Sequence, residues 1–214
     1  MPGSHFLLDV SSVAAAIRKA ERRVAKADPI MKRLIARHGP CPLAEREYQP
    51  FHILANSIIS QQLSTKAAAS IKQRVGELVG MPFQTEKVLA ASVAKLRGAG
   101  LSQAKIRYIR ELAARVSEGR MDFNQIIFLD NEAVVEILVE VPGIGRWTAE
   151  MFLIFALKRM DVLAVDDAGL QRAAGVLYGK GRASKTLLSR VAEAWRPHRS
   201  IASWYLWRSL EAGG

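Results

Sequence analysis

The chain has 214 residues, of which 50% are hydrophobic, and a formal net charge of +11 at pH 7. This length and apolar content can bury a sizeable core, in one domain or in two small lobes. The charge favours a polyanionic partner, nucleic acid or a membrane surface, although basic character alone also serves solubility. The single cysteine, Cys41, excludes an internal disulfide, a four-cysteine zinc site and an iron–sulfur cluster.

Neither a metal site nor a membrane segment is indicated. The four histidines are scattered and lack metal-ligand spacing, so we expect surface or core histidines at positions 5, 38, 52 and 198. No apolar run approaches the roughly 20 residues that span a bilayer. The first ten residues, MPGSHFLLDV, lack the basic start of a signal peptide. We therefore expect a cytoplasmic protein.

Helical periodicity dominates the chain, and no segment shows convincing strand alternation. Ser or Asp residues precede many of the apolar-periodic segments and are typical helix N-caps. This pattern predicts an all-α fold of about a dozen short helices. In chain order, the expected helices cover residues 11–27 (capped by Ser11), 29–38, 51–60, 65–78 (Ser64), 85–91, 92–97, 102–116 (Ser102), 131–140 (Asp130), 146–157, a helix from Asp166 or Asp167 to 177, 184–195 and 200–210.

The most informative segment covers residues 138–170. It opens with the turn VPGIGRW, in which Gly143 and Gly145 permit positive φ and carry no side chain. A helix hairpin with such a turn points several backbone N–H groups in one direction, which suits a phosphate. Pro142 stiffens the entry to the turn and Arg146 adds positive charge. The alternative is an ordinary corner between helices, where Pro and Gly only mark the turn.

The segment VPGIGRWTAEMF resembles the helix–hairpin–helix of the DNA glycosylase superfamily that has a Gly/Pro-rich hairpin followed by an aspartate. The family has its catalytic aspartate about two dozen residues after the hairpin, and Asp167 follows Gly145 by 22 residues (167 − 145). The resemblance extends over about residues 50–207. It implies two helical lobes with the active cleft between them. We expect one lobe to consist of residues 50–129 and the other of residues 1–49 plus 130–214.

The family pattern Asp-x-x-apolar-x-Arg/Lys selects between two adjacent carboxylates. Asp167, with Leu170 and Arg172, fits the pattern, whereas Asp166 is out of register. The resemblance therefore assigns catalysis to Asp167 and a supporting or capping role to Asp166. Plain helix capping is the alternative for both. A single carboxylate is sufficient when the leaving base is a cationic alkylated purine, because it stabilises the positive charge developing on the sugar.

The residue after the hairpin indicates the type of reaction. Bifunctional relatives that also cut the backbone have a lysine in Gly-x-Gly-x-Lys, where this chain has Trp147. No Schiff base can form there, so water is the expected nucleophile and an abasic site the product. The family's iron–sulfur loop is also missing. The chain thus resembles the alkylation-repair branch, similar to 3-methyladenine DNA glycosylase II, in a compact form without an N-terminal α/β domain.

The resemblance also implies a base pocket and DNA contacts. An aromatic face attracts a cationic base, and a flipped base needs a side chain to fill the gap that it leaves. Core packing or capping is the alternative for each of these residues. The expected pocket consists of Trp147, Trp207, Met151, Phe51 and His52. The expected DNA contacts are Gly143, Gly145, Arg146 and Thr148 at the hairpin, with Gln62 as the intercalating wedge and Leu101 probing the opposite strand.

The family also places a structural Na⁺ or K⁺ at the hairpin, and no catalytic cofactor. Its ligands would be the main-chain carbonyls of Val139, Val141 and Ile144. The implied partner is double-stranded DNA containing damaged bases, with no membrane association. We expect a monomer that works on the nucleoid of a bacterium.

The predicted function is hydrolytic release of alkylated purines, 3-methyladenine and 7-methylguanine, in base excision repair. Three alternatives stay open: a non-catalytic helix–hairpin–helix DNA-binding module, a glycosylase for another lesion such as mismatched adenine or oxidised guanine, and a bifunctional lyase. The first leaves the Asp167 register and the aromatic residues without a role.

Overall fold

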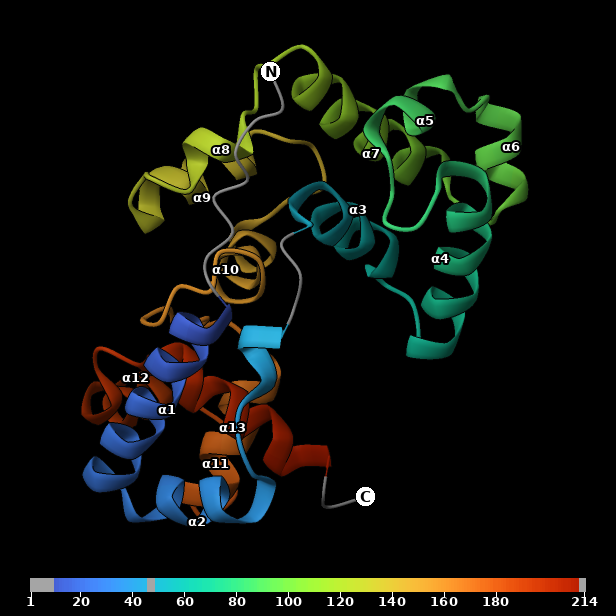
Figure 1. Cartoon of the computed structure of the whole chain (residues 1–214). Helices are drawn as coiled ribbons and strands as arrows, with labels where there is room; N and C mark the ends of the chain where they lie inside the picture. Colours follow the sequence, from blue (N-terminus) through green and yellow to red (C-terminus); the bar gives the residue numbers. More distant parts are fainter. Residues whose placement is uncertain (1–9, 46–48, 212–214) are drawn as a thin grey trace. The chain divides into compact units, whose positions relative to one another are not determined.

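The computed structural model describes residues 10–45 and 49–211, so the prediction for His5 lies outside the described residues. Every regular element within these ranges is a helix, which confirms the predicted all-α fold (Figure 1). In this part of the chain, no helix has both the length and the apolar character to cross a membrane. The chain divides into two compact units, a central unit of residues 49–152 and a terminal unit that combines residues 1–48 with 153–214.

The terminal unit brings the two ends of the chain together. Helix α1 packs on α2 and η1, while α13 contacts α1, α2 and α11. Trp195 and Tyr205 are among its largest fully buried side chains. The elements of this unit are α1 (Val10–Ala27), α2 (Pro29–His38), η1 (Pro42–Glu45), α11 (Ala168–Tyr178), α12 (Lys185–Ala192), η2 (Glu193–Trp195) and α13 (Arg199–Glu211).

Two buried carboxylates connect the N-terminal helices to the C-terminal ones. Asp28 caps α2 and also accepts hydrogen bonds from the Tyr178 hydroxyl (2.7 Å) and the Trp195 indole N–H (2.9 Å). Glu21 accepts from the Tyr205 hydroxyl at 2.6 Å. Burial and the adjacent Asp28 carboxylate raise the pKa of Tyr178. Because a buried carboxylate is costly without such donors, these bonds specify how the two ends pair.

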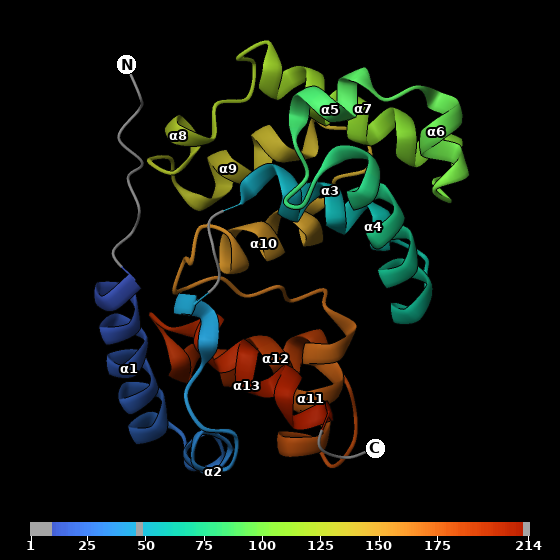
Figure 2. The same ribbon diagram turned by 45° about the vertical axis from the view of Figure 1, so that its right-hand side comes forward.

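The central unit is organised around α7, which packs against α3, α5 and α6 (Figure 2). Its core is aliphatic, with Leu54, Ile58, Ile106 and Leu112 almost fully buried. The elements are α3 (Pro50–Ser60), α4 (Thr65–Val79), α5 (Thr85–Ala90), α6 (Val93–Gly98), α7 (Gln103–Ser117), α8 (Phe123–Ile126) and α9 (Asn131–Val139), followed by α10 (Arg146–Phe155), whose last three residues belong to the terminal unit.

The predicted helices agree well with the observed ones. Ser64, Ser102 and Asp130 cap α4, α7 and α9 through their side chains, as predicted. Helix α1 begins at Val10, so Ser11 lies inside its first turn and is not the N-cap. The short α8 was not predicted, because four residues carry no readable periodicity.

The observed division of the chain differs from the expected lobes in residues 130–152, which belong to the central unit. Arg115 of α7 forms a salt bridge with Glu140 at 3.0 Å, just before the hairpin. The Gln61 side chain donates to the Gly143 carbonyl at 2.7 Å. These contacts attach α9 and the hairpin to α3 and α7, which explains the grouping.

Candidate active site

Asp167 lies at the start of α11 and its carboxylate is held from two sides. One oxygen, Oδ1, accepts the Leu170 backbone N–H (2.7 Å) and the Trp207 indole N–H (2.9 Å). The first bond is an N-cap, so the capping alternative and the predicted catalytic position fall on the same residue. The residue is buried, with 9% exposure.

Trp207 brings an aromatic face to this carboxylate. Its ring lies against Phe155, with 5.7 Å between centroids and a tilt of 33°. A Cβ at Gly169 would lie 3.0 Å from Asp167 Oδ1 and 3.3 Å from the Trp207 ring, so the small residue permits their approach. The structure thus brings together two of the predicted site residues, Asp167 and Trp207. Phe155 was missed, because nothing distinguishes it within an apolar helix.

Asp166 has a different environment. It is exposed and forms a salt bridge with Lys185. The capping role considered for it belongs to Asp167 instead, since only Asp167 reaches the Leu170 N–H. A surface ion pair of this kind contributes little to stability. The two adjacent carboxylates therefore offer a matched pair for mutagenesis, one buried beside an indole and one in solvent.

The two hairpin glycines have different conformational roles. Gly143 has φ +87°, and a Cβ there would lie 2.3 Å from the Tyr108 ring. Gly145 does not use the positive φ that glycine permits, and a Cβ there would meet nothing within 4 Å. Neither glycine N–H donates to a backbone or side-chain acceptor among the described residues. The turn therefore presents two amides without a protein acceptor, and the one at Gly145 borders open space, an arrangement that suits a phosphate.

The hairpin is supported by residues that the sequence did not single out. Gln61 donates to the Gly143 carbonyl, and Lys105 Nζ donates to the carbonyls of Ile59 and Gln61, both at 2.7 Å. Burial lowers the pKa of Lys105. Tyr108, which packs under Gly143, follows Lys105 by one helical turn on α7. One face of α7 thus holds both the hairpin and the end of α3, and only the tertiary structure reveals this pairing.

Gln62, the predicted wedge, is the next residue in the chain after Gln61. It is exposed and has φ +58°, a left-handed conformation that costs a non-glycine residue roughly 1–2 kcal/mol. Such strain persists only where the surroundings impose it. Leu101 and Thr148, in contrast, are each 4% exposed. Both side chains pack inside the protein, as in the core-packing alternative, so the contacts of Leu101 and Thr148 with DNA stay predictions.

The predicted pocket residues of the central unit fall into two groups. Trp147 is exposed by 44% despite its size, and Met151 is half-buried. Phe51 is buried with 7% exposure, as in the core-packing alternative. His52 Nδ1 accepts the Phe83 N–H (3.1 Å), and its Nε2 lies 2.7 Å from the Asn56 amide. Burial, and to a lesser extent Lys72, lowers the pKa of His52 and favours the neutral ring. Phe51 is therefore fixed by burial and His52 by its hydrogen bonds within the central unit.

Arg146 is paired within the protein. Its guanidinium forms two hydrogen bonds with Glu132, at 3.1 and 2.5 Å, and these bonds lower the pKa of Glu132. Both side chains are more than half exposed, so the net strength of the pair is small. A phosphate could replace Glu132 as the partner of Arg146 at little cost.

The hairpin carbonyls agree in chemistry with the predicted monovalent cation. Within the described residues, no backbone or side-chain donor reaches the Val139 or Ile144 carbonyl. Val141 accepts one hydrogen bond, from Ile144 N–H at 3.0 Å. Carbonyl oxygens are ligands for hard cations, so the donor set fits Na⁺ or K⁺. No group of three or more His, Cys, Asp or Glu side chains in the described chain could hold a metal ion.

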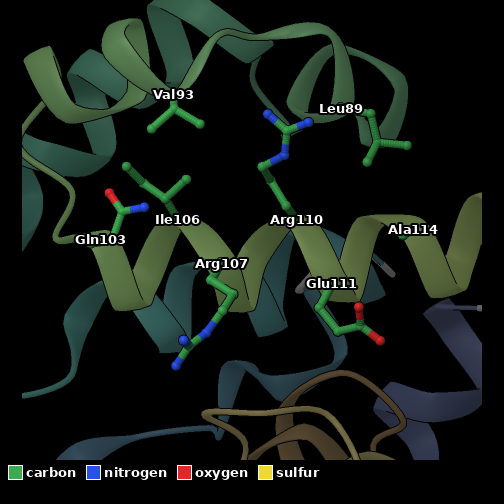
Figure 3. Close-up of a pocket in the computed structure, with 8 residues that line it drawn as sticks. All are labelled: Leu89, Val93, Gln103, Ile106, Arg107, Arg110, Glu111 and Ala114. Atoms are coloured by element: carbon green, nitrogen blue, oxygen red, sulfur yellow. The ribbon is translucent and has the colours of Figure 1, made fainter.

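A separate pocket of about 460 Å³ lies between α5, α6 and α7 (Figure 3). None of the predicted site residues lines it. Arg110 extends across it from α7 and donates to the Ala91 carbonyl at 3.1 Å. Glu111, also in its lining, is paired with Arg115 at 2.9 Å. These internal bonds engage two of the charged side chains in the lining, Arg110 and Glu111.

Comparison with known proteins agrees with this geometry. The model of the HhH-GPD superfamily of base excision DNA repair proteins matches residues 55–197. DNA-3-methyladenine glycosylase 1 of Schizosaccharomyces pombe is 31% identical, with 92% of this chain and 89% of the relative covered. The crystal structure of a Bacillus halodurans DNA-3-methyladenine glycosidase is 40% identical with a TM-score of 0.78, covering 89% of this chain and 88% of that one. The Schizosaccharomyces pombe enzyme in complex with abasic DNA has a TM-score of 0.76 at 29% identity and covers 90% and 97%. The chain belongs to the HhH-GPD superfamily of base excision DNA repair proteins.

Proposed function

We propose that this protein is a monofunctional DNA glycosylase that releases alkylated purines, such as 3-methyladenine and 7-methylguanine, from double-stranded DNA. The observation that carries the proposal is the carboxylate of Asp167, buried beside the Trp207 indole at the start of α11. The names of the relatives, DNA-3-methyladenine glycosylases, support the same substrate class.

In the proposed reaction, Asp167 stabilises the positive charge that develops on the deoxyribose as the base departs. In our proposal the Asp167 carboxylate, whose orientation the Leu170 and Trp207 N–H groups fix, faces the sugar and the attacking water. The water oxygen bonds to C1′, and the C1′–N bond electrons leave with the cationic base, which becomes neutral. The proton released by the water passes to the carboxylate or to solvent. No general acid is required, because the base already carries its positive charge.

The absence of an amine at the end of the hairpin supports hydrolysis without strand cleavage. Position 147 is tryptophan, and the preceding guanidinium of Arg146 stays protonated at any physiological pH. Neither group forms a Schiff base with the sugar. The expected product is therefore an abasic site with an intact backbone.

The cationic base would be recognised by aromatic faces. An indole beside a positive charge contributes about 0.5–2 kcal/mol, more when water is excluded. Trp207 already lies beside Asp167, and Trp147 exposes a large apolar surface at the start of α10. We propose Trp207, Trp147 and the polarizable Met151 as base-binding residues because the family resemblance implies them. An uncharged adenine or guanine gains less from this environment and is the poorer leaving group.

The central unit would grip the DNA. In the proposal, the amides of Gly143 and Gly145 bind one phosphate, with Na⁺ or K⁺ on the adjacent carbonyls as a second positive charge. Gln62 enters the space left by the flipped base. Lys105 and Gln61 keep the wedge and the hairpin at a constant separation. We propose that the protein binds as a monomer.

The decisive experiment is chromatography of the bases released from methylated calf-thymus DNA by the purified protein. We expect 3-methyladenine and 7-methylguanine in the soluble fraction, with intact strands. Duplexes carrying 8-oxoguanine or mismatched adenine serve as the comparison, and release from those alone would overturn the assignment to alkylated bases. A protein–DNA adduct trapped by borohydride would overturn the monofunctional mechanism.

A further inference from the structure

Helices α1 and α2 carry a dense group of exposed cations on the terminal unit. Five of its eight members are arginines, and no salt bridge reaches any of them within the described residues. We call this group the basic face. It consists of Arg18, Lys19, Arg22, Arg23 and Lys26 of α1 with Lys32, Arg33 and Arg37 of α2.

The basic face concentrates the charge of the whole chain. Residues 10–39 contain eight cations and two carboxylates, a net +6 (8 − 2) out of the total of +11. The two carboxylates, Glu21 and Asp28, are buried and hydrogen-bonded inside the unit. The exposed charge of this stretch is therefore entirely positive, and it repels itself when no anion is present.

The neighbouring histidines respond to this charge. Burial lowers the pKa of His198, and Arg23 and Lys19 lower it further. Burial also lowers the pKa of His38, with an added contribution from Arg37. The charges of Lys19, Arg23 and Arg37 are therefore felt inside the unit and disfavour a positive charge on these histidines, an effect that a bound polyanion would offset.

The basic face is distinct from the Asp167 site. Helix α11, which begins after Asp167, packs on α12 and α13, while α1 packs mainly on α2 and η1 and also contacts α13. Figure 2 shows α1 at the left edge of the terminal unit and α11 further to the right. Loss of charge on α1 therefore leaves the carboxylate and its indole in place.

The chemistry of the face selects the class of partner. Arg18, Arg22 and Lys26 of α1 are four residues apart, so successive charges in this row are about 6 Å apart along the helix axis. Guanidinium groups bind phosphate through paired hydrogen bonds. No exposed aromatic ring lies in this stretch to stack on bases. A membrane helix would expose its apolar stripe, whereas Ile17, Ala20 and Val24 are buried.

We propose that the basic face binds the sugar–phosphate backbone of double-stranded DNA outside the lesion, without reading its sequence. This proposal rests on the proposed function only in taking DNA as the substrate. The face holds the protein on undamaged duplex by counterion release, a strongly salt-dependent interaction. It thereby raises the chance of finding a lesion in long DNA and leaves the chemical step unchanged.

The test is the salt dependence of binding to a long undamaged duplex. The test variant combines Arg18→Gln, Arg22→Gln and Lys26→Gln. A matched control, Lys87→Gln, Lys95→Gln and Arg97→Gln, removes the same charge from exposed positions of α5 and α6. Each phosphate that the protein no longer neutralises reduces the slope of log K against log salt by about 0.9. We expect the slope of the test variant to fall by about 2–3, with a slope near the wild-type value for the control.

A wild-type slope in the test variant, or an equal decrease in the control, would overturn the proposal. Unfolding temperatures of both variants verify that they fold. The rate of base release from a short lesion duplex at saturating protein is measured in parallel and should stay within about twofold of wild type, since the face is outside the reacting site. If wild-type protein releases no base while the slope still falls, the glycosylase assignment fails and the DNA-binding face stands.

Discussion

Replacing Asp167 by asparagine separates the charge of the site from its structure. The side-chain amide keeps an oxygen at the Oδ1 position, where it can still accept the Leu170 and Trp207 N–H groups. The substitution removes the negative charge and keeps an acceptor for these two hydrogen bonds. We therefore expect a folded protein that has lost most of its rate of base release.

The effects of this substitution on the rate and on the stability are read in separate measurements. Removing a group that stabilises transition-state charge costs about 100- to 1,000-fold in rate, or about 2.7–4 kcal/mol. Exchanging a charged for a neutral acceptor in two hydrogen bonds costs roughly 1–3 kcal/mol of stability. Part of this cost is offset, because the folded variant no longer buries a charged group. A change of about 1 kcal/mol moves the unfolding midpoint by about 2–4 °C in a chain of this size. We expect a shift of only a few degrees.

Alanine at the same position gives a different result. Asp167→Ala removes the N-cap, worth about 0.5–2 kcal/mol, and leaves the Trp207 N–H without its acceptor, at about 1–3 kcal/mol. We expect its unfolding midpoint to fall by several degrees more than that of Asp167→Asn. Calorimetry checks this order, and equal midpoints would refute the inferred role of the two hydrogen bonds.

Single-turnover release of 3-methyladenine measures the catalytic loss, with Asp166→Asn as the control. Asp166 is in solvent and paired with Lys185, so its loss of charge should change the rate by less than about threefold. Wild-type rates in Asp167→Asn would sink the catalytic assignment. Loss of rate in both variants by the same factor would show that the charge of the segment, and not the position of one carboxylate, is what matters.

Three further predictions concern DNA binding and stability. Gly145→Ala should leave the unfolding midpoint within about 2 °C but weaken binding to abasic duplex at least tenfold. Gly143→Ala should weaken binding and also destabilise the fold, because the Tyr108 ring lies where the new Cβ would be. Affinities of the two variants equal to that of the wild type in a titration would contradict the phosphate site. Gln62→Ala should slow base release at least tenfold in a paired duplex and much less in a bulged one, and equal slowing would exclude the wedge role. The pKa values of His52 and the other two described histidines are lowered, so the unfolded chain binds more protons near their ordinary pKa of about 6.5. The free energy of unfolding should therefore decrease as the pH falls through and below 6.5, and an increase in denaturant titrations would show the opposite sign.

Most of the helices were predictable because their determinants are local. Side-chain caps such as Ser102 and Asp130 act over three residues, and apolar periodicity acts over a few turns. The association of the chain ends is different. Glu21 and Asp28 lie on the N-terminal helices, and their hydrogen-bond partners Tyr205 and Trp195 are more than 160 residues away in the chain. No local pattern connects such pairs.

The site shows the same division between local and distant determinants. The spacing from the hairpin to Asp167 and the missing lysine at position 147 were readable, since each is a feature of consecutive residues. Burial was not. Leu101 and Thr148 look like DNA contacts in the sequence motif and are core residues in the structure. A motif gives the position of a residue along the chain, whereas the packing of other elements decides whether its side chain reaches a ligand.

The hairpin illustrates why a motif of this kind needs a whole fold around it. Gly143 has to be glycine for two reasons, its positive φ and the Tyr108 ring that lies where a Cβ would be. Its carbonyl is occupied by Gln61, whose own carbonyl is held by Lys105. The turn is therefore preorganised by α3 and α7 before any phosphate arrives. Preorganised amides bind an anion without paying the entropy of ordering a loop, and the strained Gln62 beside them is kept ready by the same contacts.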